Sequence, residues 1–222
     1  MVTQVRWAPS YRVIASKYPT VSVYDRIAKT ADFEAVMEIE ALTNPRVREE
    51  AGDYRKIRAE DRVSGPGTTP VMASFAYTGY SRFSDGSFGV YYASREEATA
   101  IAESMYHTEV FMRATGEPSI DLDKRVYTAT IAGGYEDIRG LSARSQLYHK
   151  VSYVQSQAFS VRLYEANIVD GIVYRSVRRE AGQCVAVYRP RLVTNCKLRK
   201  YIQFRWENGK IIGVVDLSSI RS

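Results

Sequence analysis

The C-terminal segment carries the strongest local folding signal in this sequence. Two apolar runs, residues 201–206 and 211–215, flank the tetrapeptide Glu-Asn-Gly-Lys. Asn-Gly between two such runs favours a tight turn with positive φ at both central residues, and such turns join antiparallel strands. The sequence therefore predicts a β-hairpin over residues 198–217, which excludes an all-helical fold.

Helical and extended patterns alternate irregularly along the rest of the chain. Residues 31–43 and 154–165 carry apolar side chains at helical spacing, and a third helix is expected from Ser94 to about Met112. Ser94 and Glu97 match the S-x-x-E capping box of a helix start. Short runs rich in β-forming residues predict strands over residues 71–77, 88–93, 125–132, 171–176 and 183–188. Because no regular strand–helix–strand repeat is present, we expect an α+β fold.

No repeat, low-complexity segment or linker divides the chain. We therefore expect a single domain over residues 1–222, with a core at about 71–190. The turn-rich segment 64–70 is interpreted as an internal loop. Residues 30–70 are expected to form a helical insertion, and residues 198–217 the C-terminal hairpin.

The charge balance favours an anionic partner. The 222 residues include 31 Lys and Arg against 25 Asp and Glu, which gives a formal net charge of +6 and a pI of about 9.2. The basic residues form no dense run, so we expect no direct nucleic-acid partner. No apolar run approaches the roughly 20 residues that span a bilayer, and no signal peptide is recognisable. We expect a cytoplasmic protein without a membrane partner.

Several common site motifs are missing from the sequence. It contains no G-x-G-x-x-G after a strand, no Walker-A loop, no H-E-x-x-H and no G-x-S-x-G. The two cysteines, Cys184 and Cys196, form no disulfide or metal pattern with His107 and His149. We therefore expect no metal site and interpret both histidines as satisfied or surface side chains.

One segment brings together residue types that suit chemistry on an anionic substrate. Residues 79–93 read GYSRFSDGSFGVYYA and lead directly into the helix that contains Glu103. The segment offers Arg82 on a glycine-rich approach, Tyr92 near a strand end, and the carboxylate of Glu103 one to three turns into the helix. On spacing alone these residues would also fit a surface arginine, a strand filler and a solvated carboxylate.

This region resembles the RES-domain family, toxins of bacterial toxin–antitoxin pairs that are named for characteristic Arg, Glu and Ser residues. The family pattern places an Arg in a G-R-[FW]-[NS]-x-x-G segment, which corresponds to Arg82. A Tyr in a V-Y-Y-A strand and a Glu in the following A-x-A-E helix correspond to Tyr92 and Glu103. These correspondences identify the three residues as candidate site residues.

Later and earlier motifs extend the resemblance over roughly residues 10–190. Residues 170–176 match the family segment D-G-[IV]-x-Y-x-S, which identifies the characteristic serine as Ser176. A Ser-Gln pair ending at Gln157 also recurs, and a Tyr-Arg pair ending at Arg12 matches the family's N-terminal Tyr-Arg. The long spacing after this pair and the C-terminal hairpin resemble the longer, ParT-like branch of the family.

The resemblance implies the fold of ADP-ribosyltransferase toxins and an activity on NAD+. The implied reaction cleaves the bond between nicotinamide and ribose, with water or phosphate as acceptor. Arginine forks bind phosphate oxygens bidentately, so Arg12 and Arg82 are the expected ligands of the pyrophosphate. NAD+ is then a consumed substrate, and no cofactor is expected.

The remaining candidates have roles near the nicotinamide and its ribose. Tyr92 would stack on the positively charged nicotinamide ring, and Glu103 would stabilise the oxocarbenium-like ribose. Ser176 and Gln157 would hydrogen-bond substrate, because no base for a nucleophilic serine is evident. Strand alternation sends Tyr91 and Tyr92 to opposite faces, so only one of the two can line the site.

The resemblance also implies an Xre-type DNA-binding antitoxin as partner and inhibition of bacterial growth by the free chain. One alternative keeps the site and changes the acceptor, which makes the chain a mono-ADP-ribosyltransferase that modifies a cellular protein. A further alternative is a basic RNA- or nucleotide-binding module without catalysis. It rests on the net charge of +6 and the 17 tyrosines.

Overall fold

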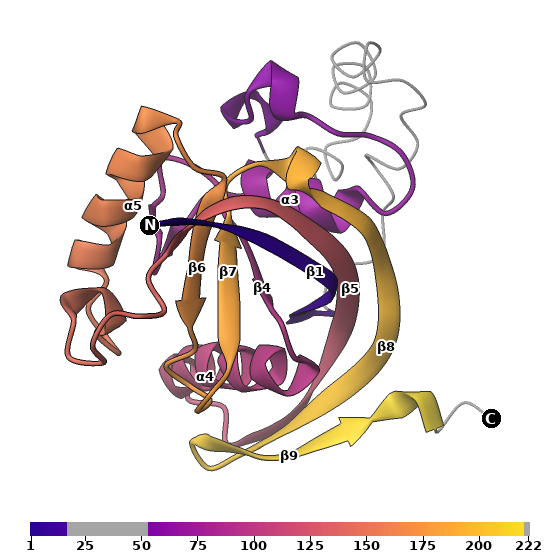
Figure 1. Cartoon of the computed structure of the whole chain (residues 1–222). Helices are drawn as coiled ribbons and strands as arrows, with labels where there is room; N and C mark the ends of the chain where they lie inside the picture. Colours follow the sequence, from indigo (N-terminus) through magenta and orange to yellow (C-terminus); the bar gives the residue numbers. More distant parts are fainter. Residues whose placement is uncertain (17–52, 220–222) are drawn as a thin grey trace.

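Figure 1 shows a computed structural model in which long, curved strands are flanked by helices. The structure describes residues 1–16 and 53–219. The helix predicted at residues 31–43 lies outside the described residues, as do residues 30–52 of the predicted insertion. The strands of the main sheet are β1 (Val2–Ala15), β4 (Tyr91–Ser94), β5 (Ser119–Asp137), β6 (Gly171–Arg175), β7 (Gln183–Val187), β8 (Val193–Glu207) and β9 (Lys210–Asp216).

The remaining elements lie around this sheet. A small separate hairpin consists of β2 (Tyr80–Ser81) and β3 (Ser84–Asp85). The α-helices within the described residues are α3 (Thr69–Ala76), α4 (Glu97–Thr115) and α5 (Val154–Ala166). Short 3-10 helices are η3 (Tyr54–Lys56), η4 (Ala59–Asp61), η5 (Gln146–Tyr148), η6 (Pro190–Leu192) and η7 (Leu217–Ser219). None of the helices that the structure describes is long and apolar enough to cross a membrane.

The main sheet closes partly on itself. Its strand order is β1-β4-β7-β6-β5-β8-β9, and β1 also pairs with β5 along most of its length. The strands β1, β4, β7, β6 and β5 therefore form a closed circuit, from which β8 and β9 continue. All neighbouring strands are antiparallel except β5 and β6. This largely antiparallel sheet with separate helices confirms the predicted α+β class.

Most predicted elements are confirmed. The C-terminal hairpin is β8–β9, and its turn has φ of 46° at Asn208 and 90° at Gly209, as expected for Asn-Gly. The predicted strands near residues 88–93, 125–132, 171–176 and 183–188 are β4, β5, β6 and β7. The helix predicted at residues 154–165 is α5, which ends at Asn167 in a left-handed conformation.

The strand predicted over residues 71–77 is wrong, because this segment forms α3. Pro70 lies in the first turn of α3, where a missing backbone N–H is tolerated. The buried residues Val71, Met72, Phe75 and Ala76 follow helical spacing. A short apolar run does not by itself distinguish a buried strand from a buried helix.

The helix predicted after Ser94 is confirmed as α4, but the predicted capping box is wrong. Ser94 is buried at the end of β4, and its Oγ lies 3.4 Å from Sγ of Cys184. The helix begins after Glu96, whose carboxylate accepts a hydrogen bond from Thr99 Oγ1 at 3.1 Å. The pairing of β4 with β7 includes Ser94, which pairs with Cys184, so α4 begins two residues later than the capping box predicts.

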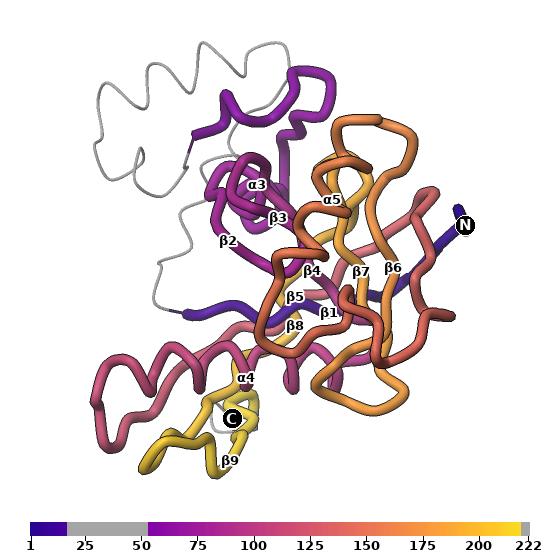
Figure 2. The backbone as a smooth tube through the Cα atoms, turned by 90° about the vertical axis from the view of Figure 1, so that its left-hand side faces the viewer, coloured from indigo at the N-terminus to yellow at the C-terminus, as the bar shows by residue number. Residues whose placement is uncertain are grey.

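α3 and α4 lie toward opposite ends of the short strands β4, β6 and β7, and α5 lies beside these strands (Figure 1). Figure 2 shows the hairpin β2–β3 between α3 and α5, with α4 passing below the ends of β4, β6 and β7. A buried aromatic cluster packs beneath this hairpin and includes Phe83, Phe88, Tyr174 and Tyr188. This cluster gives the candidate residues on β4, α4 and the loop after β6 a well-packed support.

Candidate active site

The carboxylate of Glu103 on α4 is bound by the hydroxyl of Ser176, which follows β6. Ser176 Oγ donates to Glu103 Oε1 at 2.6 Å, the short distance typical of a hydroxyl on a charged carboxylate. The same Oγ accepts the backbone N–H groups of Arg178 and Arg179, both at 3.0 Å. These three contacts fix the hydroxyl and aim its proton at Glu103, so Ser176 orients the carboxylate.

The phenol of Tyr92 lies between β4 and the hairpin β2–β3. Its hydroxyl lies 2.8 Å from Ser81 Oγ and accepts the backbone N–H of Phe83 at 2.9 Å. Burial raises the pKa of Tyr92 to about 12, so the hydroxyl stays protonated at neutral pH. The neighbouring Tyr91 points to the opposite face and is 1% exposed in the core. Of the two tyrosines, only Tyr92 is therefore available to the site.

Arg82 is buried in the turn between β2 and β3. Its Nη1 donates to the carbonyl oxygens of Leu147 at 3.2 Å and His149 at 3.0 Å. The guanidinium also lies over the ring of Tyr153, 4.7 Å from its centroid. Arg82 therefore fastens the 147–153 loop to the hairpin, and its positive charge forms no ion pair with any residue that the structure describes.

The buried hydroxyl of Tyr174 lies near three of the candidate side chains. Burial raises the pKa of Tyr174 well above its usual value, and the nearby groups Cys184, Glu103 and Tyr92 raise it further, whereas Arg82 lowers it. Glu103, Tyr92 and Arg82 thus act on one hydroxyl from different elements of the fold. We refer to Glu103, Ser176, Tyr92 and Arg82 as the Glu103 cluster.

Arg12 lies where β1 and β4 separate. The two strands share one paired position, Tyr11 with Ser94, and β1 then continues along β5 alone. Arg12 Nη1 donates to the carbonyl oxygen of Tyr92 at 2.9 Å, and its guanidinium lies 4.6 Å from the ring centroid of Tyr91. Burial lowers the pKa of Arg12. A side-chain hydrogen bond therefore replaces the strand ladder at this position.

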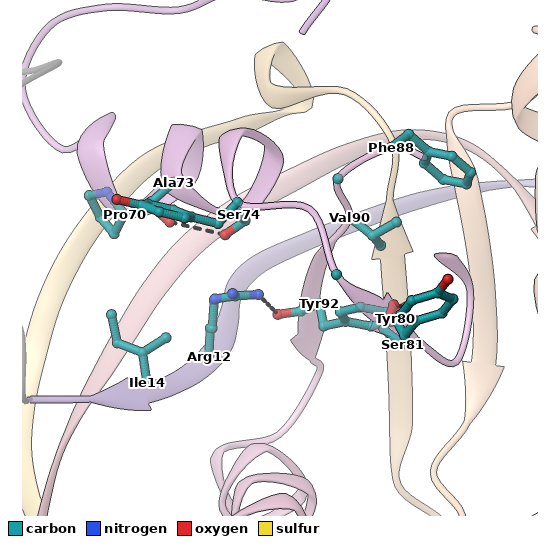
Figure 3. A pocket seen from close by; sticks show the side chains of 13 residues that line it. Arg12, Ile14, Pro70, Ala73, Ser74, Tyr80, Ser81, Phe88, Val90 and Tyr92 are labelled. Carbon is teal, nitrogen blue, oxygen red and sulfur yellow. Dashed lines mark hydrogen bonds between the residues drawn. The ribbon is translucent and has the colours of Figure 1, made fainter. Parts of the chain in front are cut away.

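A pocket of about 340 Å³ opens beside Arg12, between β1, β4, α3 and the hairpin β2–β3. Figure 3 shows α3 on one side of Arg12 and the rings of Tyr80 and Tyr92 on another. Neither Glu103 nor Ser176 lines this pocket. Tyr92 belongs both to the pocket and to the Glu103 cluster, so the two are neighbours that share one aromatic ring.

Gln157 on α5 contacts the protein backbone. Its amide nitrogen donates to the carbonyl oxygens of Ser81 at 2.8 Å and Ser84 at 3.1 Å. One turn further, Ser160 Oγ donates to the carbonyl oxygen of Phe83 at 2.7 Å. Both side chains therefore clamp the β2–β3 hairpin to α5. Sequence reasoning missed Ser160, although its spacing of three residues from Gln157 places it on the same helix face.

The sequence model of the RES domain matches residues 57–207, which is more than half of the chain. The chain belongs to the RES-domain family. Among relatives, the uncharacterized protein y4oC of Sinorhizobium fredii is 26% identical over 204 residues, or 90% of this chain and 84% of y4oC. A solved structure, the M. tuberculosis MbcT–MbcA toxin–antitoxin complex, aligns with a TM-score of 0.46 and 9% identity over 91% of this chain and 86% of the matched chain.

The RES match includes every candidate residue except Arg12. Inside the matched region, sequence reasoning missed two arginines that lie two and three residues after the characteristic serine. The guanidinium of Arg178 stacks 3.2 Å from the ring centroid of Tyr106, and Arg179 Nη1 donates to Thr99 Oγ1 at 3.1 Å. The signal for both was their position next to Ser176. Both arginines add positive charge close to Ser176.

The two histidines of the RES domain differ in their surroundings. His149 Nδ1 accepts the backbone N–H groups of Val151 at 3.2 Å and Ser152 at 2.8 Å, so this ring shapes the loop that Arg82 holds. His107 is exposed on α4 with its ring edge toward Tyr106. Within the part of the chain that the structure describes, no three His, Cys, Asp or Glu side chains gather as a metal site.

Proposed function

We propose that this RES protein is a toxin that consumes NAD+ by cleaving the bond between nicotinamide and ribose. The observation that carries the proposal is the carboxylate of Glu103, which Ser176 Oγ holds at 2.6 Å and which shares the neighbour Tyr174 with Tyr92 and Arg82. Membership of the RES family supports the same chemistry.

Glu103 suits the charge that develops as nicotinamide leaves. The ribose then becomes oxocarbenium-like, and a nearby carboxylate stabilises that positive charge. Ser176 and Cys184 both contact Oε1 of Glu103. Among the described residues Oε2 makes no hydrogen bond, which leaves it available for a ribose hydroxyl. The carboxylate is thus oriented on one side and open on the other.

The two candidate arginines suit different tasks. Arg12 borders the pocket, and its Nε is buried without a hydrogen-bond partner among the described residues. Arg12 is therefore the preferred ligand of the pyrophosphate. Arg82 uses Nη1 on two carbonyl oxygens. Its role in the proposal is to position the hairpin and to supply positive potential for an anionic substrate.

The proposal includes a protein partner. We propose an Xre-type antitoxin, on the basis of the family resemblance, as the chain that holds this activity in check. Such a partner would act by covering the pocket or the Glu103 cluster. Co-expression of a cognate antitoxin should restore growth to cells that produce the chain.

The activity is tested by incubating the purified chain with NAD+ labelled in its adenosine half. We expect release of free nicotinamide, and the position of the label then identifies the acceptor. Label in ADP-ribose indicates water, label in ADP-ribose 1-phosphate indicates phosphate, and label on a protein band indicates ADP-ribosylation. A folded chain that releases no nicotinamide, with phosphate and a cell extract both present, would contradict the proposal.

Replacing the serine tests the orienting contact. We expect Ser176→Ala to lower kcat about tenfold with little change in KM, because a hydrogen bond to a charged group contributes about 1.5–3 kcal/mol. The measurement is the steady-state rate of nicotinamide release. Ser119→Ala, at an exposed strand start, serves as the matched control. Equal kcat values for Ser176→Ala and the control would remove Ser176 from the mechanism.

A further inference from the structure

Tyr80 is an aromatic side chain that the fold leaves almost fully exposed. It begins β2, is 86% exposed, and lines the pocket beside Arg12. The tyrosine next to the pocket on β4, Tyr92, is instead held by two hydrogen bonds through its hydroxyl. The ring of Tyr80 is therefore largely open to the pocket and solvent.

The strand that carries Tyr80 is held in place. Gln157 donates to the carbonyl oxygens of Ser81 and Ser84, and Ser160 donates to that of Phe83. The residue after Tyr80 is thus anchored to α5 through the backbone. Because the backbone on this side of the ring is already anchored, a flat ligand that stacks on Tyr80 has mainly the rotamers of one side chain to order.

The charge beside this ring lacks a protein counter-ion. Among the residues that the structure describes, Arg12 forms no ion pair, and its buried Nε has no hydrogen-bond partner. A buried polar group without a partner is unfavourable, and a bound anion would satisfy it. The guanidinium borders the pocket, so an anion bound there would place a counter-charge beside it.

The size and lining of the pocket limit which ligands can bind there. Its volume of about 340 Å³ lies at the lower end for small-molecule sites, with a largely apolar wall and the hydroxyls of Ser74 and Ser81 as polar groups. This volume suits one base with its ribose phosphate better than a whole dinucleotide. The rest of a larger nucleotide would pass Tyr92 toward Glu103.

We propose that this pocket is a nucleoside-phosphate site in which Tyr80 stacks on the base and Arg12 binds the phosphate. The inference deepens the proposed function and relies on it for the identity of the complete substrate. An adenine and a nicotinamide both present a flat ring joined through ribose to a phosphate. Tyr80 would then determine affinity for one half of NAD+.

The test measures binding without turnover. Glu103→Gln protein is titrated by NMR with adenosine monophosphate, nicotinamide mononucleotide and ribose 5-phosphate. We expect Tyr80→Ala in this background to weaken binding of one mononucleotide about tenfold, within the range of base–aromatic stacking, and to leave ribose 5-phosphate unchanged. Tyr80→Phe keeps the ring and should stay within about twofold of the parent. Phe111→Ala, which removes an exposed ring on α4 away from the pocket, is the matched control.

The outcomes separate this inference from the proposed function. A Tyr80-dependent loss for adenosine monophosphate supports the adenine half, and the same loss for nicotinamide mononucleotide supports the nicotinamide half. Failure of both mononucleotides to bind, or equal affinities in Tyr80→Ala and the parent, overturns the inference even if the wild-type chain consumes NAD+. Tyr80-dependent binding by a wild-type chain that never releases nicotinamide overturns the proposed function and leaves the inference standing.

Discussion

Glu103→Gln should lower the rate of NAD+ consumption by about 10²–10³-fold while the protein stays folded. The amide has nearly the same shape as the carboxylate, and its oxygen can still accept the proton that Ser176 Oγ donates. What the variant loses is the negative charge beside the ribose. We expect the change in kcat, because that charge acts on the transition state more than on bound substrate. The measurement is kcat for nicotinamide release by purified protein.

The same variant can be examined in cells. Shortly after induction, the NAD+ level should fall with the wild-type chain and stay near its starting value with Glu103→Gln. Glu165→Gln replaces an exposed carboxylate on α5 and provides the matched control. If Glu103→Gln inhibits growth as strongly as this control at equal expression, the catalytic role of Glu103 is wrong. Growth arrest by wild type with NAD+ intact would favour modification of a protein instead.

Local signals in the sequence predicted those elements whose geometry is decided within a few residues. Asn208 and Gly209 adopt the positive φ values that their residue types favour, so the hairpin β8–β9 follows from the sequence. α3 was missed, because its eight residues are too few for periodicity to separate a helix from a strand. In this segment, the burial of one face against the sheet decides that the residues form a helix.

The site depends on partners that are distant in the sequence. The resemblance put Arg82, Tyr92, Glu103 and Ser176 in order, and the structure places the first three near Tyr174 and Ser176 on Glu103. Their contacts were not predictable. The two acceptors of Arg82 are backbone carbonyls more than sixty residues away, which leave no side-chain signal.

The choice between two adjacent tyrosines shows the same limit. Alternation predicted that Tyr91 and Tyr92 face opposite sides, which the structure confirms. Which of the two tyrosines faces the core depends on the placement of β1. Arg12 on this strand lies over the ring of Tyr91. Gln157 likewise fits a substrate ligand by residue type, whereas its amide contacts the backbone at Ser81.

Gly171→Ala should reduce the free energy of unfolding by about 4 kcal/mol, the combined effect of a steric clash and a strained backbone. A Cβ at this first residue of β6 would lie 2.0 Å from the carbonyl oxygen of Ala186, which is backbone. Its φ of 152° also lies in a region that residues with a side chain rarely adopt. Urea unfolding monitored by circular dichroism gives the free energy, and the corresponding loss in Tm is roughly 10 °C.

The clash at Gly171 should also displace residues of the candidate active site. Ala186 on β7 pairs with Ile172 on one side and with Tyr92 on the other, so moving its carbonyl shifts the strand that carries Tyr92. We therefore expect Gly171→Ala to lose NAD+ turnover at temperatures where the variant is still folded. Gly140→Ala, whose Cβ would meet nothing within 4 Å, should change the free energy of unfolding by less than about 0.5 kcal/mol. An unfolding free energy for Gly171→Ala within about 1 kcal/mol of this control would show that β6 and β7 do not approach as closely as described.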